Sequence, residues 1–420
     1  MTFDLVVRNA RLLGHTTGML DIGVRDGRLA EIGVGLPRGV RNEDAAGQLV
    51  APGLVETHIH LDKTGILDRC AICEGTVAEA IAETAKAKLA FTQEDIYARG
   101  RETLERAIAN GTQYMRAHTE VDPRIGLKGL HAVRALARDY VWAIDLGICV
   151  YPQEGLTNDP GSFELLVEAC EQGVDAIGGC PYTDPNPHAQ ITTIFELALR
   201  FDLDVDFHLD FDLDPSWNHI EEVCRQTEAN RWGGRVAVGH MTKLSAMPPA
   251  AQIALARRMA DAGVALTVIP STDLFLMGRD AGHNVPRGVA RADRFLDQGV
   301  TVSLATNNVM NAFTPFGDAS LIRTANLYAN IAQLGRPEDL DKCLAMISTS
   351  AARLMNLKGY GLTVGNEANF VVLAADTGAA AVAALAQPLV AYKRGIHTVT
   401  RAAAMLHCPT LEKSHRRGAL

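Results

Sequence analysis

The feature that most constrains the fold is an alternation of apolar strands with helical segments along the middle of the chain. Helical patterns such as those at 78–90 and 160–173 separate the strands. Eight such units favour a TIM barrel over an open doubly wound sheet, because each parallel strand needs a crossover helix. The predicted strands cover residues 54–60, 112–121, 142–153, 175–182, 204–211, 236–241, 265–271 and 301–308.

Both ends of the chain carry short strands in place of this alternation. Residues 3–8 and 19–33 predict strands joined by turns, and so do residues 369–375 and 392–401. We therefore expect an α/β protein with a (β/α)8 TIM-like barrel over residues 53–359. A small β-sandwich domain would be formed by both termini, residues 1–52 and 360–420.

Composition narrows the range of partners. The net charge is −9 and the longest basic run is a short "HRR" near the C-terminus, so neither nucleic acid nor an anionic membrane is expected as the main partner. No uncharged apolar stretch of about 18 residues occurs, which predicts no membrane span. The charged start does not resemble a signal peptide, and the 8 scattered cysteines fit a reduced, cytoplasmic protein. The sequence leaves open whether the protein forms a homo-oligomer.

Histidines close several of the predicted strands. In "APGLVETHIHLDKTG" (51–65), His58 and His60 are two residues apart and therefore share a strand face. His208 and His240 end two later strands. In a barrel these strand ends meet at the face where the chemistry occurs. Packing does not easily explain so many inward imidazoles, so the pattern predicts a metal site.

These motifs resemble the amidohydrolase superfamily. "APGLVETHIH" (51–60) is similar to its opening motif, the histidines fall on strands 1, 5 and 6 as in that superfamily, and the likeness extends to "YGLTVGNEANFVVL" (360–373). "YPQEGL" (151–156) and "TPFGD" (314–318) resemble the cytosine deaminase group. "HLDKT" (60–64) is similar to the N-isopropylammelide amidohydrolases of that group, which act on an s-triazine ring.

The resemblance implies roles for particular residues. His58, His60 and His208 would bind one divalent metal ion, zinc or iron, which lowers the pKa of bound water and stabilises an oxyanion. His240 would polarise the substrate carbonyl or orient the attacking water, and Gln153 would read the edge of a flat heterocycle. Residues 175–182 contain no lysine that could bridge a second metal ion, so one metal is expected.

Two positions depart from the superfamily. Asn307 stands where an aspartate at the end of strand 8 would ligate the metal and take a proton, and an amide cannot act as a general base. Phe211 occupies the glutamate position of the H-x-x-E motif that begins at His208, so a standard cytosine deaminase is not expected. We expect Asp210 or Glu120 to carry protons instead.

Further side chains are expected to bind the substrate. Lys63 follows the first histidine strand and is predicted to bind a substrate oxygen or to pair with Asp62 or Glu120. Trp217 and Phe211 lie near the end of strand 5, where aromatic rings can stack on a planar heterocycle.

Together these features predict an enzyme, an amidohydrolase acting on C–N bonds other than peptide bonds. Metal-bound hydroxide would attack a small nitrogen heterocycle. Deamination, opening of a cyclic amide and cleavage of an N-alkyl group all begin with this step, so the sequence leaves them open. The alternative is a non-catalytic heterocycle-binding relative that has lost the strand-8 aspartate.

Overall fold

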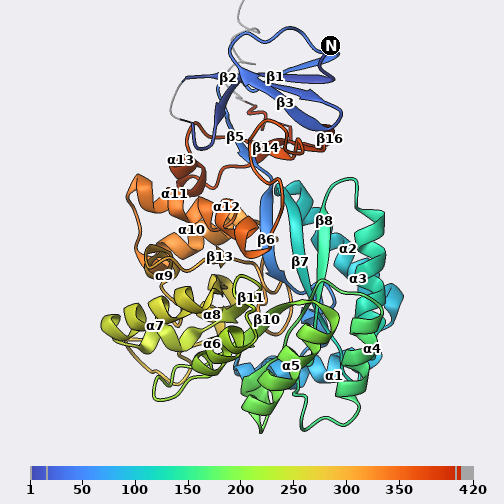
Figure 1. The fold of residues 1–420 in the computed structure, drawn as a ribbon, viewed down its shortest axis with the longest axis vertical. Coiled ribbons are helices and arrows are strands. Elements are labelled where there is room, and N and C mark those ends of the chain that lie inside the picture. Colours follow the sequence, from blue (N-terminus) through green and yellow to red (C-terminus); the bar gives the residue numbers. More distant parts are fainter. Residues whose placement is uncertain (1, 16–17, 403, 408–420) are drawn as a thin grey trace, which may run out of the picture.

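The central element of the fold is a barrel of parallel strands (Figure 1). A computed structural model describes residues 2–15, 18–402 and 404–407, which leaves the "HRR" run (415–417) outside the described residues. The strands pair in chain order, and a bridge between Ile59 and Asn307 joins the first strand to the segment after the last. The strands are β6 (Leu54–Ile59), β7 (Thr112–Glu120), β8 (Asp145–Tyr151), β9 (Ala176–Ile177), β10 (Asp204–Leu209), β11 (Val236–His240), β12 (Val264–Val268) and β13 (Val302–Leu304).

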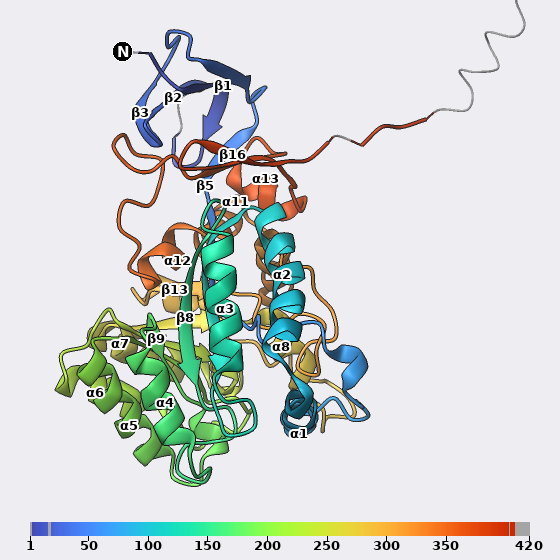
Figure 2. The ribbon, with the colours of Figure 1, turned by 90° about the vertical axis from the view of Figure 1, so that its right-hand side faces the viewer.

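Helices cover the outside of the barrel, as α2 and α3 do beside β7 and β8 (Figures 1 and 2). The threonine hydroxyls that precede α1 and α2 accept the N–H groups of Glu79 and Asp95, which fixes where these helices begin. The helices are α1 (Val77–Ala87), α2 (Gln93–Ala109), α3 (Lys128–Asp139), α4 (Ser162–Glu171), α5 (Pro187–Phe201), α6 (Ile220–Ala229), α7 (Pro249–Ala262), α8 (Pro270–Leu276), α9 (Ala292–Asp297), α10 (Leu321–Ala332), α11 (Pro337–Ala345), α12 (Thr349–Leu354) and α13 (Gly378–Ala383).

Strands from the two ends of the chain form a second, separate sheet (Figure 2, top). Its strands run in the order β16-β15-β14-β5-β1-β2-β3, with β4 paired to β1. They are β1 (Leu5–Leu12), β2 (Leu20–Arg25), β3 (Arg28–Gly33), β4 (Arg41–Asp44), β5 (Leu49–Pro52), β14 (Phe370–Leu373), β15 (Pro388–Lys393) and β16 (Ile396–Thr400). The predicted fold class is thereby confirmed, while the domain boundaries at residues 52/53 and 359/360 stay a prediction.

Two strand predictions need correction. Residues 392–401 form a hairpin, because Arg394 and Gly395 turn the chain with φ of 49° and 70°. The strand predicted at 175–182 shortens to two residues at β9. There the backbone of Gly178 lies so close to β10 that an added Cβ would meet the carbonyl oxygen of Asp206 at 2.0 Å.

The chain shows no membrane-crossing helix within the described residues. One large apolar core fills the space between the barrel and its helices, and a smaller core lies within the terminal sheet. The barrel's inner face is different, because it carries polar side chains near the carboxyl ends of its strands. The side chains of His58, His118 and His208 are at most 2% exposed.

Candidate metal centre and active site

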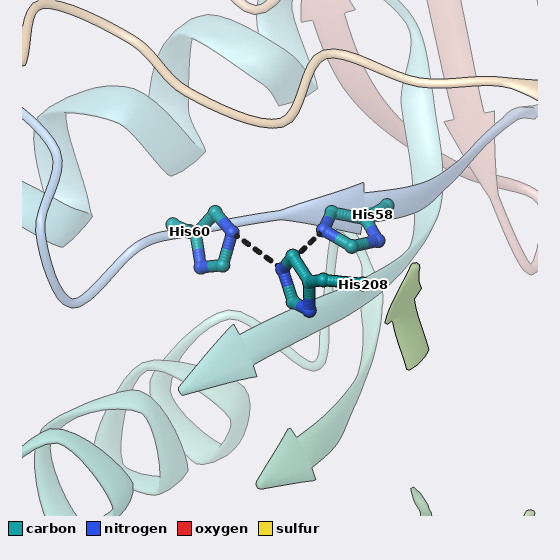
Figure 3. A group of neighbouring side chains, drawn as sticks. All are labelled: His58, His60 and His208. Atoms are coloured by element: carbon teal, nitrogen blue, oxygen red, sulfur yellow. Dashed lines mark hydrogen bonds between the residues drawn. The ribbon is translucent and has the colours of Figure 1, made fainter. Parts of the chain in front are cut away.

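Three histidines from two barrel strands point their ring nitrogens at one another (Figure 3). His58 lies on β6 and His60 directly follows it, while His208 lies on β10. The Nε2 atom of His208 is 3.0 Å from that of His58 and 3.3 Å from that of His60. A tetrahedral metal ion with metal–nitrogen distances of about 2.0–2.1 Å holds its ligand nitrogens about 3.3 Å apart. The three nitrogens therefore fit a metal-ligand set.

The electrostatics of these histidines also suit a metal. Burial lowers the pKa of all three imidazoles well below its usual value. The neighbouring imidazoles lower it further, as does Lys63 for His60 and His208. They are therefore neutral, which is the form that binds metals. The Nδ1 atom of His60 lies 3.2 Å from the carbonyl oxygen of His118, so it can donate its proton there and leave Nε2 free for a metal.

Asn307 contacts two of these histidines, His58 and His60, through its backbone. Its backbone N–H donates to the carbonyl of His58 at 2.8 Å, and its carbonyl accepts from the N–H of His60 at 2.8 Å. Its Nδ2 donates to Thr272 at 3.2 Å, whereas its Oδ1 is buried and has no hydrogen-bond partner among the residues that the structure describes. A buried amide oxygen without a partner is costly, and a cation would satisfy it. The position therefore fits a fourth ligand.

Further polar side chains from β7 and β10 contact the histidines. The ring of His118 on β7 stacks on that of His58, with centroids 3.6 Å apart and planes 19° from parallel. Asp206 lies 3.4 Å from His118 and 3.0 Å from Arg116, both distances measured between side-chain N and O atoms. Arg116 also pairs with Asp204, the other aspartate of β10, at 3.2 Å.

Lys63 lies in a buried ionic network next to the histidines. Its Nζ donates to Glu120 at 2.7 Å, to Tyr151 at 3.0 Å and to Gln153 at 3.2 Å. The pairing with Glu120 is one of the two roles predicted for this lysine. Tyr151 continues the network to the metal ligands, since its hydroxyl is 3.2 Å from the Nδ1 of His60.

Glu120 is shared between two ammonium groups. Its other carboxylate oxygen accepts from Lys88 at 2.7 Å. Burial alone would raise the pKa of Glu120, but Lys63 and Lys88 outweigh burial and lower that pKa to about 2. Lys88 also contacts the carboxylates of Asp122 and Glu154 at 2.6 Å.

A continuous line of contacts links this network to His240. Gln153 donates to the hydroxyl of Tyr182 at 3.4 Å, and the ring of Tyr182 lies 5.8 Å from that of Phe211. Phe211 stacks on His240 with ring centroids 3.8 Å apart. We call Lys63, Gln153, Tyr182 and Phe211 the substrate wall. Three of its four members are predicted substrate-binding residues.

The structure does not bring Asp210 and Trp217 to the histidine cluster. Both carboxylate oxygens of Asp210 accept backbone N–H groups at the start of α6, at 3.0 and 3.1 Å from the nitrogen of His219. Trp217 is 42% exposed and its ring packs under the ammonium of Lys243. Neither side chain makes a hydrogen bond or ion pair with the three histidines in the described part of the chain. Their predicted roles stay predictions.

His240 has a partner that the sequence reasoning missed. Its Nδ1 lies 2.7 Å from Oδ1 of Asp273 on α8, and both side chains are buried. Burial raises the pKa of Asp273, while the contact with His240 opposes this rise. The sequence did contain one signal for this partner, because Asp273 is a carboxylate that follows the end of β12 by five residues. Lys88 and Tyr182 were missed because nothing in their local patterns distinguishes them from surface residues.

Comparison with known proteins identifies the family to which the chain is similar. The sequence profile of the amidohydrolase family matches residues 41–148 and 150–399. The chain is 28% identical over 381 residues to N-isopropylammelide isopropyl amidohydrolase of Pseudomonas sp. (strain ADP), covering 88% of this chain and 91% of that protein. It is 25% identical over 366 residues to pterin deaminase of Rhizobium rhizogenes, covering 84% and 82% of the two chains.

A solved structure of a related enzyme has the same fold. The crystal structure of 5-methylcytosine deaminase from Klebsiella pneumoniae, liganded with 5-fluorocytosine, superposes with a TM-score of 0.91 at 27% identity. The superposition covers 96% of this chain and 100% of that one. The predicted resemblance to the cytosine deaminase group is confirmed.

Proposed function

Because the chain belongs to the amidohydrolase family, we propose that it is a metal-dependent enzyme that hydrolyses a C–N bond in a small nitrogen heterocycle. The observation that carries this proposal is the convergence of the Nε2 atoms of His58, His60 and His208. The buried Oδ1 of Asn307, which has no hydrogen-bond partner among the described residues, supports it. The relatives suggest the substrate class, because their names specify N-isopropylammelide, a pterin and 5-methylcytosine.

His58, His60, His208 and the Oδ1 of Asn307 would hold one divalent metal ion, and zinc or iron suits three imidazoles and one oxygen. Such an ion supplies hydroxide at neutral pH by lowering the pKa of a water molecule. The imidazole of His240 would contact the reacting group. These four ligands lie on rigid barrel strands or their ends, which suits a preorganised site.

The substrate wall would bind the heterocycle. Lys63 and Gln153 offer polar groups to ring oxygen and nitrogen atoms, and Phe211 offers an aromatic face. In the free protein Lys63 and Gln153 are already hydrogen-bonded to each other at 3.2 Å, so their polar atoms are held in place before a ligand arrives. A preformed polar edge costs less entropy on binding than a mobile one.

Turnover of a heterocycle panel tests this proposal. The protein, loaded in turn with zinc, iron(II) and manganese, would be incubated with N-alkylated triazines, methylated cytosines, pterins and cyclic imides. Release of ammonia indicates deamination, release of an alkylamine indicates N-alkyl cleavage, and a ring-opened acid indicates cyclic amide hydrolysis. Binding of these compounds without any product would overturn the enzymatic proposal in favour of a binding protein.

We expect Asn307→Asp to tighten metal binding. A carboxylate contact to a cation exceeds a neutral amide contact by about 1 kcal/mol or more, which corresponds to roughly tenfold in the dissociation constant. Competition with a fluorescent zinc chelator measures this affinity. Asn308→Asp is the matched control, because Asn308 lies next in the chain and its Oδ1 already accepts from Asn311. Equal affinities for the wild type and Asn307→Asp would remove Asn307 from the site.

We also propose a cytoplasmic location and the two-domain division at residues 52/53 and 359/360. The 7 described cysteines are all free thiols, which fits a reducing compartment. The terminal sheet takes strands only from β1–β5 and β14–β16, which supports the division. Limited proteolysis followed by mass spectrometry tests the second boundary, since the chain around residue 360 is accessible whereas residues 49–62 are buried, so cleavage should concentrate near residue 360.

A further inference from the structure

The proposed reaction needs a group that moves protons, and the expected carriers are occupied. Asn307 is an amide and cannot accept a proton at neutral pH. Both oxygens of Asp210 accept backbone N–H groups of α6. Both oxygens of Glu120 accept from lysines, and its pKa of about 2 makes it a weak base. A proton carrier must therefore come from elsewhere in the site.

His240 lies beside the cluster and combines a carboxylate partner at one ring nitrogen with a second ring nitrogen that makes no hydrogen bond among the described residues. Its centroid lies 5.7 Å from that of His208 and 6.2 Å from that of His58. Its Nδ1 lies 2.7 Å from Asp273, and its Nε2 makes no hydrogen bond within residues 2–15, 18–402 and 404–407. A carboxylate at Nδ1 holds the proton on that nitrogen and leaves Nε2 as a base.

Local structure fixes the orientation of this ring. Phe211 stacks on one face of the imidazole at 3.8 Å. The backbone of His240 has φ of 68°, in the left-handed region that non-glycine residues seldom adopt. Such conformations concentrate at active sites, where packing imposes them. The Asp273 carboxylate is fixed in turn by a 3.4 Å contact with the N–H of Ile269.

We propose that His240 and Asp273 form a proton-carrying dyad that replaces the absent strand-8 aspartate. This inference rests on the proposed function. Nε2 of His240 accepts a proton from water while the water oxygen bonds to the sp² carbon next to the ring nitrogen. The C–N bond then breaks, and the same proton passes from Nε2 to the leaving nitrogen. Asp273 is a positioning residue, because it holds the proton on Nδ1 and stabilises the transient imidazolium.

Asp273→Asn tests the dyad through kinetics. The amide keeps the shape of the side chain, but its NH₂ group can donate to Nδ1 and move the histidine proton to Nε2. We expect kcat to fall about 10²–10⁴-fold, with KM changed only a few-fold and the metal content unaltered. Asp293→Asn is the matched control. Asp293 is also a buried aspartate, but it contacts Arg291 and Tyr328 on the outer helices, so kcat should be retained.

A second measurement does not depend on turnover. Long-range ¹H–¹⁵N spectra of histidine-labelled, chelator-treated protein report which ring nitrogen carries the proton, and the loss of one signal set in His240→Gln assigns His240. The wild type should show the proton on Nδ1, and Asp273→Asn should show it on Nε2. A wild-type proton on Nε2, or an unchanged kcat in Asp273→Asn, would overturn the dyad while leaving the proposed function intact. An inactive wild type would overturn the proposed function itself.

Discussion

His208→Ala should abolish both metal retention and turnover. The substitution removes the nitrogen that lies within 3.0–3.3 Å of the other two ligand nitrogens, so the remaining pair cannot complete a tetrahedral set. Loss of the metal removes several kcal/mol of transition-state stabilisation, which corresponds to a rate loss of about 10³-fold or more. Plasma mass spectrometry of the purified variant measures the metal, and the heterocycle assay measures the rate.

A surface histidine provides the control for this result. His131 on α3 is exposed and its ring lies 3.1 Å from Gln172, so His131→Ala should keep both the metal and the activity. His58→Ala should behave like His208→Ala, because the two side chains share the site. Circular dichroism would establish that the variants are folded. Full activity in a folded His208→Ala protein would contradict the assignment of the ligands.

Lys88→Met should lower the free energy of unfolding by about 3–5 kcal/mol at pH 7, because it leaves buried carboxylates without their cation. Lys88 has 2% of its side-chain surface exposed and contacts Glu120, Asp122 and Glu154. Burial would lower the pKa of Lys88, but the three carboxylates raise it overall, which keeps the ammonium charged. Urea denaturation followed by circular dichroism measures the change.

The pH dependence of this loss has a definite sign. In the wild type the pKa of Glu120 is held at about 2, so its ionised form stabilises the fold above its unfolded pKa and that contribution disappears as the pH falls towards 2. Without Lys88 the folded carboxylates bind protons more tightly, so the variant gains stability relative to the wild type on going from pH 7 to pH 5.

Lys86→Met is the control for Lys88→Met. It removes a lysine two residues away, whose side chain is 72% exposed, and the denaturation midpoint should stay unchanged. A midpoint for Lys88→Met equal to that of Lys86→Met at pH 7 would show that the buried network contributes nothing to stability.

The sequence predicted the barrel and the inward histidines that meet inside it, because both depend on local pattern. His58 and His60 share a face through the two-residue period of a strand, and the same period relates His118 to Glu120. The inner position of His208 follows from its place at the end of an apolar strand. The fold class followed similarly from the alternation of strands with helices, and the resemblance to amidohydrolases added the order in which the histidines appear.

Asp273 and Lys88 were not predicted as partners of these residues, because they come from distant parts of the chain. Asp273 reaches His240 across 33 residues, and Lys88 reaches Glu120 across 32. No periodicity relates such pairs. For Asp210 the local pattern suggested a position that the structure does not show: two residues after His208, the strand period allowed its side chain to point inward. Instead its φ of 49° ends the strand, and its carboxylate caps α6.

Metal content of the wild type tests the central claim most directly. The protein would be purified without chelators or metal-affinity resin and measured by plasma mass spectrometry. A centre formed by His58, His60, His208 and Asn307 predicts about one zinc or iron ion per chain, removed by chelation and restored by adding the ion back. Protein that carries no metal and takes up none from added zinc, iron or manganese would contradict the metal centre, and with it the proposed hydrolysis.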